Sequence, residues 1–96
     1  MAAFFIATIK IKNAEKFQEY GSKVPATIAA FGGELVTRGQ VKNVLAGNAN
    51  NQVGAVVSFP DMEALQGWYD SADYQALIPL REEAAEAMIV AYEAAV

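Results

Sequence analysis

Residues 4–12 constrain the fold of this chain more than any other segment. Their side chains alternate as in a β-strand, and the face that carries Phe5 and Ile9 is apolar throughout. The opposite face begins apolar, with Phe4 and Ile6, and ends basic. A sheet with one solvated face would be polar along that whole second face. Phe4 and Ile6 therefore need a cover, which is either a helix or a partner subunit.

A long amphipathic helix is expected next, from an N-cap at Asn13 to about residue 31. Apolar residues recur along it at spacings of three and four, which makes one stripe: Phe17, Tyr20, Val24, Ile28 and Phe31. Pro25 removes one helical hydrogen bond, and the residue that it crowds is Gly21, so we expect a kinked helix rather than two helices. Gly32 and Gly33 then end the helix, because glycine adopts the left-handed C-cap conformation at little cost.

Two strands are predicted in the middle of the chain. The first covers residues 34–38 and continues irregularly to Leu45. The second covers residues 53–59, and its β-branched side chains suit a central position in a sheet. The asparagine-rich stretch between them, residues 48–52, is typical of a turn-rich loop. The two strands thus follow one another without a helix between them.

The last third of the chain is predicted to contain helices and a final strand. Asp61 and Ser71 each cap a helical segment. From residue 84 onward, alanine and glutamate favour a helix, while the alternation of apolar residues fits a strand equally well. The preceding elements lack one strand to complete a split βαβ repeat, so we predict a strand from about Met88. The fold class is therefore α+β, a ferredoxin-like βαββαβ antiparallel sheet, in a single domain of residues 1–96.

Charge and hydropathy exclude several classes of function. The net charge is −4 and the seven Lys and Arg residues are spread along the chain, so we expect no binding to nucleic acid, which needs clustered cations. No apolar run approaches the roughly 20 residues of a membrane span. The first residues lack the features of a signal peptide, and we expect a cytoplasmic protein without membrane contact.

The residue types that are missing limit the chemistry further. The chain has no histidine and no cysteine, which excludes Ser/His/Asp and Cys/His nucleophilic sites. No metal site and no cofactor is implied, since histidine is the commonest transition-metal ligand. Hydrophobic residues make up 54% of the chain, more than one thin core of this size hides easily. This excess favours a homodimer, although an ordinary alanine-rich core is the alternative.

The candidate ligand-binding residues are Arg38, Trp68, Tyr69, Tyr74 and Arg81. The guanidinium of Arg38 suits a carboxylate or phosphate, and Gly39 beside it would let a ligand approach closely. An ion pair with Glu34 or with the other subunit is the alternative. The aromatic residues either line a small-molecule pocket or pack in the core. Arg81 lies two helical turns after Tyr74, and points either toward Arg38 or toward acidic side chains at the surface.

Several motifs occur together and in a fixed order. They are Gly32-Gly33 with Arg38-Gly39, Val56-Val57-Ser58-Phe59-Pro60, Trp68-Tyr69-x-Ser71-x-x-Tyr74-Gln75, and Leu80-Arg81 before a short apolar ending. Over nearly the whole chain this set resembles the family known as domain of unknown function 1330. The resemblance implies a dimeric α+β barrel, in which two four-stranded sheets pack face to face and the helices lie outside. That packing would cover the apolar second face of the first strand.

The resemblance leaves the function open. Relatives in the broader group include cofactor-free monooxygenases, small isomerases and haem-handling enzymes, and the absence of histidine counts against haem ligation and imidazole chemistry. We favour a homodimer that binds a small, anionic organic ligand in a pocket near the sheet and the second helix. The alternative is a cofactor-independent enzyme, similar to a monooxygenase or an isomerase, that acts on a small organic substrate. A purely structural dimer without a pocket is a third interpretation.

Overall fold

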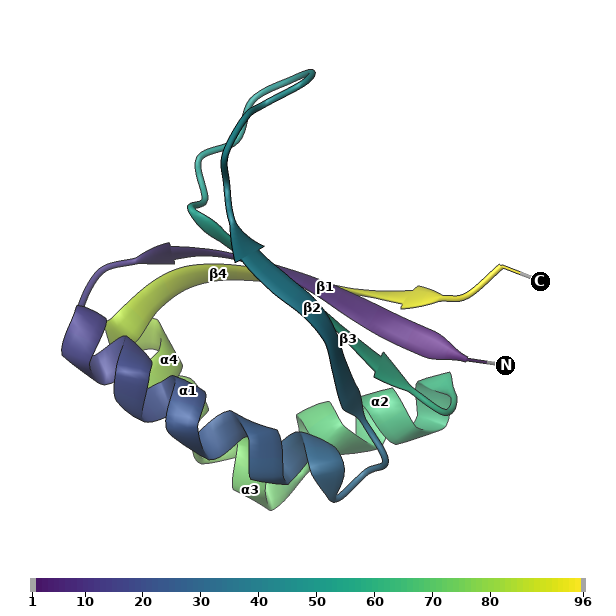
Figure 1. The fold of residues 1–96 in the computed structure, drawn as a ribbon. Helices are drawn as coiled ribbons and strands as arrows, with labels where there is room; N and C mark the ends of the chain where they lie inside the picture. The colour runs from purple at the N-terminus through teal and green to yellow at the C-terminus, as the bar shows by residue number, and fades with distance from the viewer. Residues whose placement is uncertain (1, 96) are drawn as a thin grey trace.

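The computed structural model describes residues 2–95. The chain forms a four-stranded antiparallel sheet with the helices on one of its faces (Figure 1). The elements in order are β1 (Ala3–Ile11), α1 (Ala14–Ala29), β2 (Glu34–Gln40), β3 (Val53–Phe59), α2 (Met62–Asp70), α3 (Ala72–Gln75), α4 (Ile78–Ala84) and β4 (Ala85–Glu93). The strand order is β2-β3-β1-β4, which confirms the predicted ferredoxin-like sheet, with β3 in a central position.

The two faces of the sheet have different surroundings. On the inner face, which the helices cover, Phe5 and Ala7 of β1 are buried. Phe4 and Ile6 alternate with these residues and lie on the outer face of the sheet. Each of the two pairs with residues of β3 and β4, and Phe4 lies opposite Ser58. Within residues 2–95 no helix covers that outer face (Figure 1), so the cover that the sequence demands is not helical.

The core between the sheet and the helices is centred on Trp68 and Tyr74, the largest fully buried side chains. The Trp68 ring stacks on Phe5 of β1 with 5.0 Å between ring centroids, and it lies 4.3 Å from the Tyr74 ring. Its indole Nε1 donates to Thr27 Oγ1 of α1 at 3.0 Å, which satisfies the buried donor. Trp68 therefore joins α2 to β1, α1 and α3.

Three of the predicted helix caps are confirmed. The side chains of Asn13, Asp61 and Ser71 accept hydrogen bonds from the backbone N–H three residues on, at 3.0, 2.8 and 3.2 Å. α1 is one helix that runs through Pro25 and ends at Ala29, two residues earlier than expected. Gly32 has φ of 75°, so the left-handed turn that glycine permits does follow the helix.

Two strand boundaries differ from the prediction. β4 is a strand as predicted, but it begins at Ala85 instead of Met88. Residues 85–87 pair with residues 9–11 of β1, and this long-range pairing outweighs the helix propensity of alanine and glutamate. β2 ends at Gln40, so residues 41–45 do not continue the strand as expected.

Residues 41–52, which we call the β2–β3 arm, project from the sheet on the side away from the helices (Figure 1). At its base Val41 N–H donates to the Gln52 carbonyl at 2.7 Å, and Asn51 Nδ2 donates to Thr8 Oγ1 at 2.9 Å. Leu45 in the arm is 92% exposed. Within residues 2–95, no helix combines the length and the apolar character that crossing a membrane requires.

Candidate functional site

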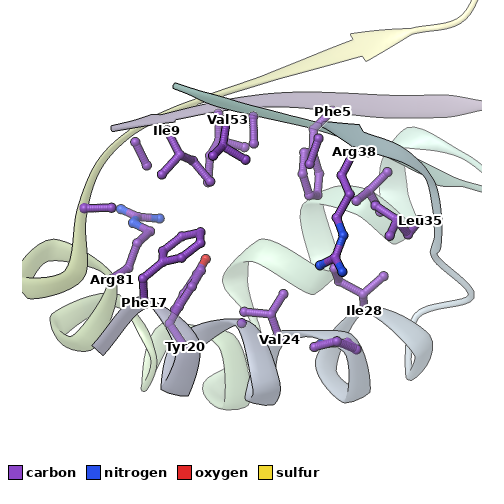
Figure 2. Close-up of a pocket in the computed structure, with 18 of the residues that line it drawn as sticks. Phe5, Ile9, Phe17, Tyr20, Val24, Ile28, Leu35, Arg38, Val53 and Arg81 are labelled. Atoms are coloured by element: carbon purple, nitrogen blue, oxygen red, sulfur yellow. The ribbon is translucent and has the colours of Figure 1, made fainter. Parts of the chain in front are cut away.

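A cavity of about 250 Å³ lies between the inner face of the sheet and α1 (Figure 2). The sheet side of the cavity includes small residues on three different strands, Ala7, Ala55 and Ala87. The α1 side contributes Phe17 and Val24 among its apolar members. Because small side chains lie opposite the helix, the two layers do not fill the space between them. The wall is predominantly apolar, as is usual for a small-molecule site.

Polar side chains enter this cavity from its two ends. Figure 2 shows Arg38 extending from β2 at one end, and Arg81 and Tyr20 at the other. These side chains come from β2, α4 and α1, so three elements that are far apart in the sequence supply the polar groups. An apolar body with few, well-separated polar anchors is the ligand shape that this arrangement fits.

A hydrogen-bond network supports the end of the cavity formed by Tyr20 and Arg81. The hydroxyl oxygens of Tyr20 and Tyr74 lie 2.7 Å apart. Arg81 Nη1 donates to Tyr74 Oη at 3.0 Å and, more weakly, to Tyr69 Oη at 3.4 Å. Arg81 Nη2 also pairs with the exposed Glu82 carboxylate at 3.1 Å. Four side chains from α1, α2, α3 and α4 are thereby held around one guanidinium.

The charge states at this end of the cavity follow from burial and hydrogen bonding. Burial raises the pKa of the Tyr20 hydroxyl far above its usual value, and the neighbouring Tyr74 raises it further. Burial alone would lower the pKa of Arg81, but the hydrogen bonds to Tyr69 and Tyr74 outweigh that effect and raise it. The Tyr20 hydroxyl is therefore neutral, while Arg81 is a permanent cation.

Arg38 has different surroundings. Its side chain lines the cavity, yet within residues 2–95 it makes neither an ion pair nor a side-chain hydrogen bond, so the alternative of a pair with Glu34 is wrong. The expected role of Gly39 is also wrong, because Gly39 pairs with Gly54 and does not line the cavity. The lining glycines are Gly21 and Gly33, which come from α1 and the turn after it.

The structure brings the candidate residues together in two groups. Arg38, Trp68 and Arg81 line the cavity. Tyr69 and Tyr74 do not line it, but their hydroxyl groups hold Arg81 in place. Arg81 combines both roles proposed for it, since it borders the same cavity as Arg38 and also pairs with an acidic side chain at the surface.

Sequence reasoning missed Tyr20 and the part that α1 takes in the wall of the cavity. Tyr20 was grouped with the apolar stripe of the first long helix, and it does lie on the buried side of that helix at 8% exposure. The only signal was its hydroxyl, a polar group at a position that the pattern predicts to be buried. Among the helices, α1 contributes the most residues to the wall of the cavity, whereas α2 contributes Trp68.

The sheet order and the helical layer define this protein as a ferredoxin-like α+β domain. The chain belongs to the family described as domain of unknown function (DUF1330), which matches residues 2–95. This confirms the resemblance found in the sequence motifs. A search of curated proteins finds no significant match.

Several solved structures share the fold at low sequence identity. A protein of unknown function from Rhodopseudomonas palustris has a TM-score of 0.84 at 15% identity, over 99% of this chain and 83% of that one. A dimeric ferredoxin-like protein of unknown function from Jannaschia sp. CCS1 has a TM-score of 0.76 at 11% identity, with 98% and 100% covered. SnoaB from Streptomyces nogalater, described as a cofactor-independent oxygenase, has a TM-score of 0.72 at 10% identity, with 99% and 94% covered.

Proposed function

We propose that this protein binds a small organic anion with an apolar body in the cavity between α1 and the sheet. The observation that carries the proposal is Arg38, a guanidinium that borders an apolar cavity and has no protein partner within residues 2–95. The volume of about 250 Å³ lies below the roughly 300–1,000 Å³ of pockets for drug-sized ligands. The ligand is therefore smaller than a typical drug molecule.

Arg38 suits the role of anionic anchor better than Arg81 does. Three of the five N–H groups of Arg81 are already engaged by Tyr69, Tyr74 and the Glu82 carboxylate. Arg38 has its donors available, and the planar guanidinium can take both oxygens of a carboxylate. Arg38 is also exposed, so a bound carboxylate would keep part of its hydration. Its desolvation cost would consequently be small.

The single tryptophan gives a direct test of this proposal, because Trp68 borders the cavity. Titration with 4-nitrobenzoate should quench Trp68 fluorescence in a saturable way. Arg38→Ala should weaken that binding by about tenfold, as expected for loss of a charge-assisted hydrogen bond at an exposed site. The same substitution should change the binding of the uncharged 4-nitrobenzamide little.

Lys42→Ala is the matched control, since it removes one exposed positive charge from the nearby β2–β3 arm without touching the cavity lining. It should bind 4-nitrobenzoate as the wild type does. Equal affinity in wild type and Arg38→Ala would contradict the anchor role. Quenching that never saturates would contradict the ligand site as a whole.

We also propose that the protein is a homodimer in which the outer faces of two sheets pack together. This face carries large apolar side chains that remain open to solvent, with Met88 at 57%, Val90 at 40% and Tyr92 at 42% exposure. The dimeric relative of the same fold from Jannaschia sp. CCS1 supports the assembly. Size-exclusion chromatography with light scattering should give twice the chain mass. A monomer at micromolar concentration would contradict it.

A cofactor-independent enzyme on a small organic substrate is the second candidate. Tyr20 and Arg81, a donor and a cation that face the apolar cavity together, favour it, as does the fold shared with the oxygenase SnoaB. Oxygen uptake on a panel of small phenols should then fall in Tyr74→Phe or Arg38→Ala. Equal rates in wild type and both variants would remove these residues from any mechanism.

A further inference from the structure

We propose that Tyr20 is the last donor of a one-way hydrogen-bond chain, Arg81 to Tyr74 to Tyr20, and that it donates to a phenolate- or enolate-type oxygen of the ligand. This inference rests on the proposed ligand-binding function and adds the chemistry of the ligand's second end. The ligand would carry one anionic group at Arg38 and one strongly accepting oxygen at Tyr20.

The first step of the chain has a fixed direction. A guanidinium has donors and no acceptor, so Arg81 Nη1 donates to Tyr74 Oη at 3.0 Å and never the reverse. The Tyr74 oxygen is therefore an acceptor toward Arg81. Its own hydrogen must find a different partner.

Burial fixes the second step. Tyr74 is 0% exposed, so solvent does not receive its hydrogen. Within residues 2–95, the acceptor that its hydroxyl reaches is Tyr20 Oη at 2.7 Å. If Tyr20 donated instead, the Tyr74 hydrogen would be buried without an acceptor, a situation that folded proteins largely avoid. The favoured order is therefore Tyr74 to Tyr20.

The third step leads into the cavity. With its oxygen occupied by the Tyr74 hydrogen, Tyr20 retains its own hydrogen for another partner. Figure 2 shows the Tyr20 hydroxyl pointing from α1 into the cavity, whose wall around it is formed by apolar side chains such as Phe17. Within residues 2–95 no other side chain accepts from Tyr20, so a bound molecule is the natural acceptor.

The chain also favours an acceptor that carries negative charge. Each hydrogen bond in a row polarises the next, and this row starts at a permanent cation. The guanidinium of Arg81 borders the same end of the cavity and adds direct electrostatic attraction. A phenolate or enolate oxygen gains more from both effects than a neutral hydroxyl does. Burial raises the pKa of Tyr20, so its hydroxyl stays neutral and keeps the hydrogen that it would donate.

The test uses 4-nitrophenol, a coloured phenol whose ionisation is read from its absorbance, together with nitrobenzene, which lacks the phenolic oxygen. Wild-type protein should bind 4-nitrophenolate and lower the pKa of the bound phenol below that of the free one. Tyr20→Phe should weaken phenolate binding by roughly threefold to tenfold and raise the bound pKa by about half a unit to one unit. Nitrobenzene binding, followed by Trp68 quenching, should be equal in both proteins.

Tyr92→Phe on the outer face is the matched control, because it removes a hydroxyl outside the cavity lining. It should behave as wild type with both probes. Tyr74→Phe tests the direction of the chain, and it should weaken phenolate binding less than Tyr20→Phe does, since Tyr20 can still donate. Circular dichroism establishes that each variant is folded.

Four results would overturn the inference. The first is wild-type protein that fails to bind 4-nitrophenolate, and the second is Tyr20→Phe that binds 4-nitrophenolate as Tyr92→Phe does. The third is a loss of nitrobenzene binding in Tyr20→Phe equal to its loss of phenolate binding. The fourth is a larger loss of phenolate binding in Tyr74→Phe than in Tyr20→Phe. Each leaves the proposed function standing if 4-nitrobenzoate still binds through Arg38. Loss of that Arg38 dependence contradicts the proposed function instead, so the two failures are distinguishable.

Discussion

The two faces of the sheet are built from the same strands but have opposite relations to their surroundings. On the inner face, small residues such as Ala7 and Ala55 lie under a helical layer and leave a cavity with cations at its ends. On the outer face, Phe4 and Tyr92 stack with 5.1 Å between their ring centroids, and no helix covers them within residues 2–95. The inner face thus encloses a cavity with cations at its ends, whereas the outer face is apolar at its centre and has no helical cover within residues 2–95.

This difference shows that hydrophobicity alone does not identify a site. A partly enclosed apolar space with a few donors and cations fits a small molecule. An open apolar surface without such groups at its centre fits another protein surface. The charged pair on the outer face, Lys10 opposite Glu86, lies toward one end of the strands and leaves the centre around Ile6 and Val90 uncharged. We therefore assign the inner face to a ligand and the outer face to a second copy.

The largest effect is expected from Val90→Asp on the outer face. Val90 pairs with Ile6 at the centre of that face and is 40% exposed, so the monomer should tolerate the aspartate. In a dimer, each buried and unpaired carboxylate would cost about 3–5 kcal/mol. We expect the dimer to dissociate at micromolar concentration, as measured by light scattering.

Ala72→Asp is the control for this substitution. It adds the same charge at an exposed first-turn position of α3 on the helical side of the molecule, where a negative charge is tolerated. This variant should keep the wild-type mass. A Val90→Asp protein that is still dimeric would show that the outer face is not the interface. The assignment of that face to a second copy would then be wrong.

A second pair of variants tests the comparison on adjacent residues of one strand. Ala55→Leu adds volume on the inner face and should fill part of the cavity, which would weaken 4-nitrobenzoate binding by at least about tenfold. Val56→Leu changes the neighbouring residue, which pairs with Ile6 on the outer face, and should leave binding unchanged. Both should shift the free energy of unfolding by about 1.5 kcal/mol or less. Equal binding in the two variants would show that the ligand lies elsewhere.

The polar end of the cavity predicts a pH dependence of stability. Above about pH 10 an unfolded tyrosine loses its proton, while Tyr20 in the folded state keeps it, because its pKa is raised. The folded state then binds more protons than the unfolded state. Its free energy of unfolding should fall by about 1.4 kcal/mol per pH unit from this group.

Tyr20→Phe should remove this contribution to the pH dependence of the free energy of unfolding, as measured by urea denaturation between pH 8 and about pH 11. At neutral pH the variant should be less stable than wild type by about 1–3 kcal/mol, because the Tyr74 hydrogen loses its acceptor. The gap between the two proteins should therefore narrow as the pH rises. Phe17→Leu alters the adjacent, non-titrating ring and should keep the wild-type slope. A constant gap for Tyr20→Phe would contradict the assignment.

Features of this fold that depend on residues close together in the sequence could be predicted. The caps at Asn13, Asp61 and Ser71 are such features, because each side chain bonds a backbone N–H three residues on. The strand at residues 53–59 was predicted with its observed ends. The start of β4 was predicted three residues late, since its pairing with β1 involves residues about 75 positions apart, which local propensity does not report.

The candidate site was predictable only in part, for the same reason. Arg38 was found because a glycine follows it in a predicted strand, and Arg81 because it lies two helical turns after Tyr74. The cavity is not visible, because it arises where alanines from separate strands lie opposite one helix. Tyr20 acquires its role from Tyr74, 54 residues further along the chain, and nothing near Tyr20 in the sequence signals that contact.

The smallest expected effect concerns Gly21, a glycine in the interior of α1 that borders the cavity. Two reasons for this glycine are distinguishable. Pro25 crowds the residue four positions before it, which would favour a glycine there. However, a Cβ added at Gly21 meets no atom within 4 Å outside the backbone of its own helix, so the Pro25 ring does not occupy that space.

Gly21→Ala should therefore stabilise the protein by about 0.4–1 kcal/mol, because alanine loses less conformational freedom in a helix than glycine does. Urea denaturation measures the change, and 4-nitrobenzoate binding shows whether the added methyl group enters the cavity. Increased stability with weaker binding would mean that the glycine preserves space for the ligand at a cost to the helix. Decreased stability would instead show that crowding by Pro25 is the reason for the glycine. Gly21 would then be required by the backbone of α1 rather than by the cavity on the inner face of the sheet.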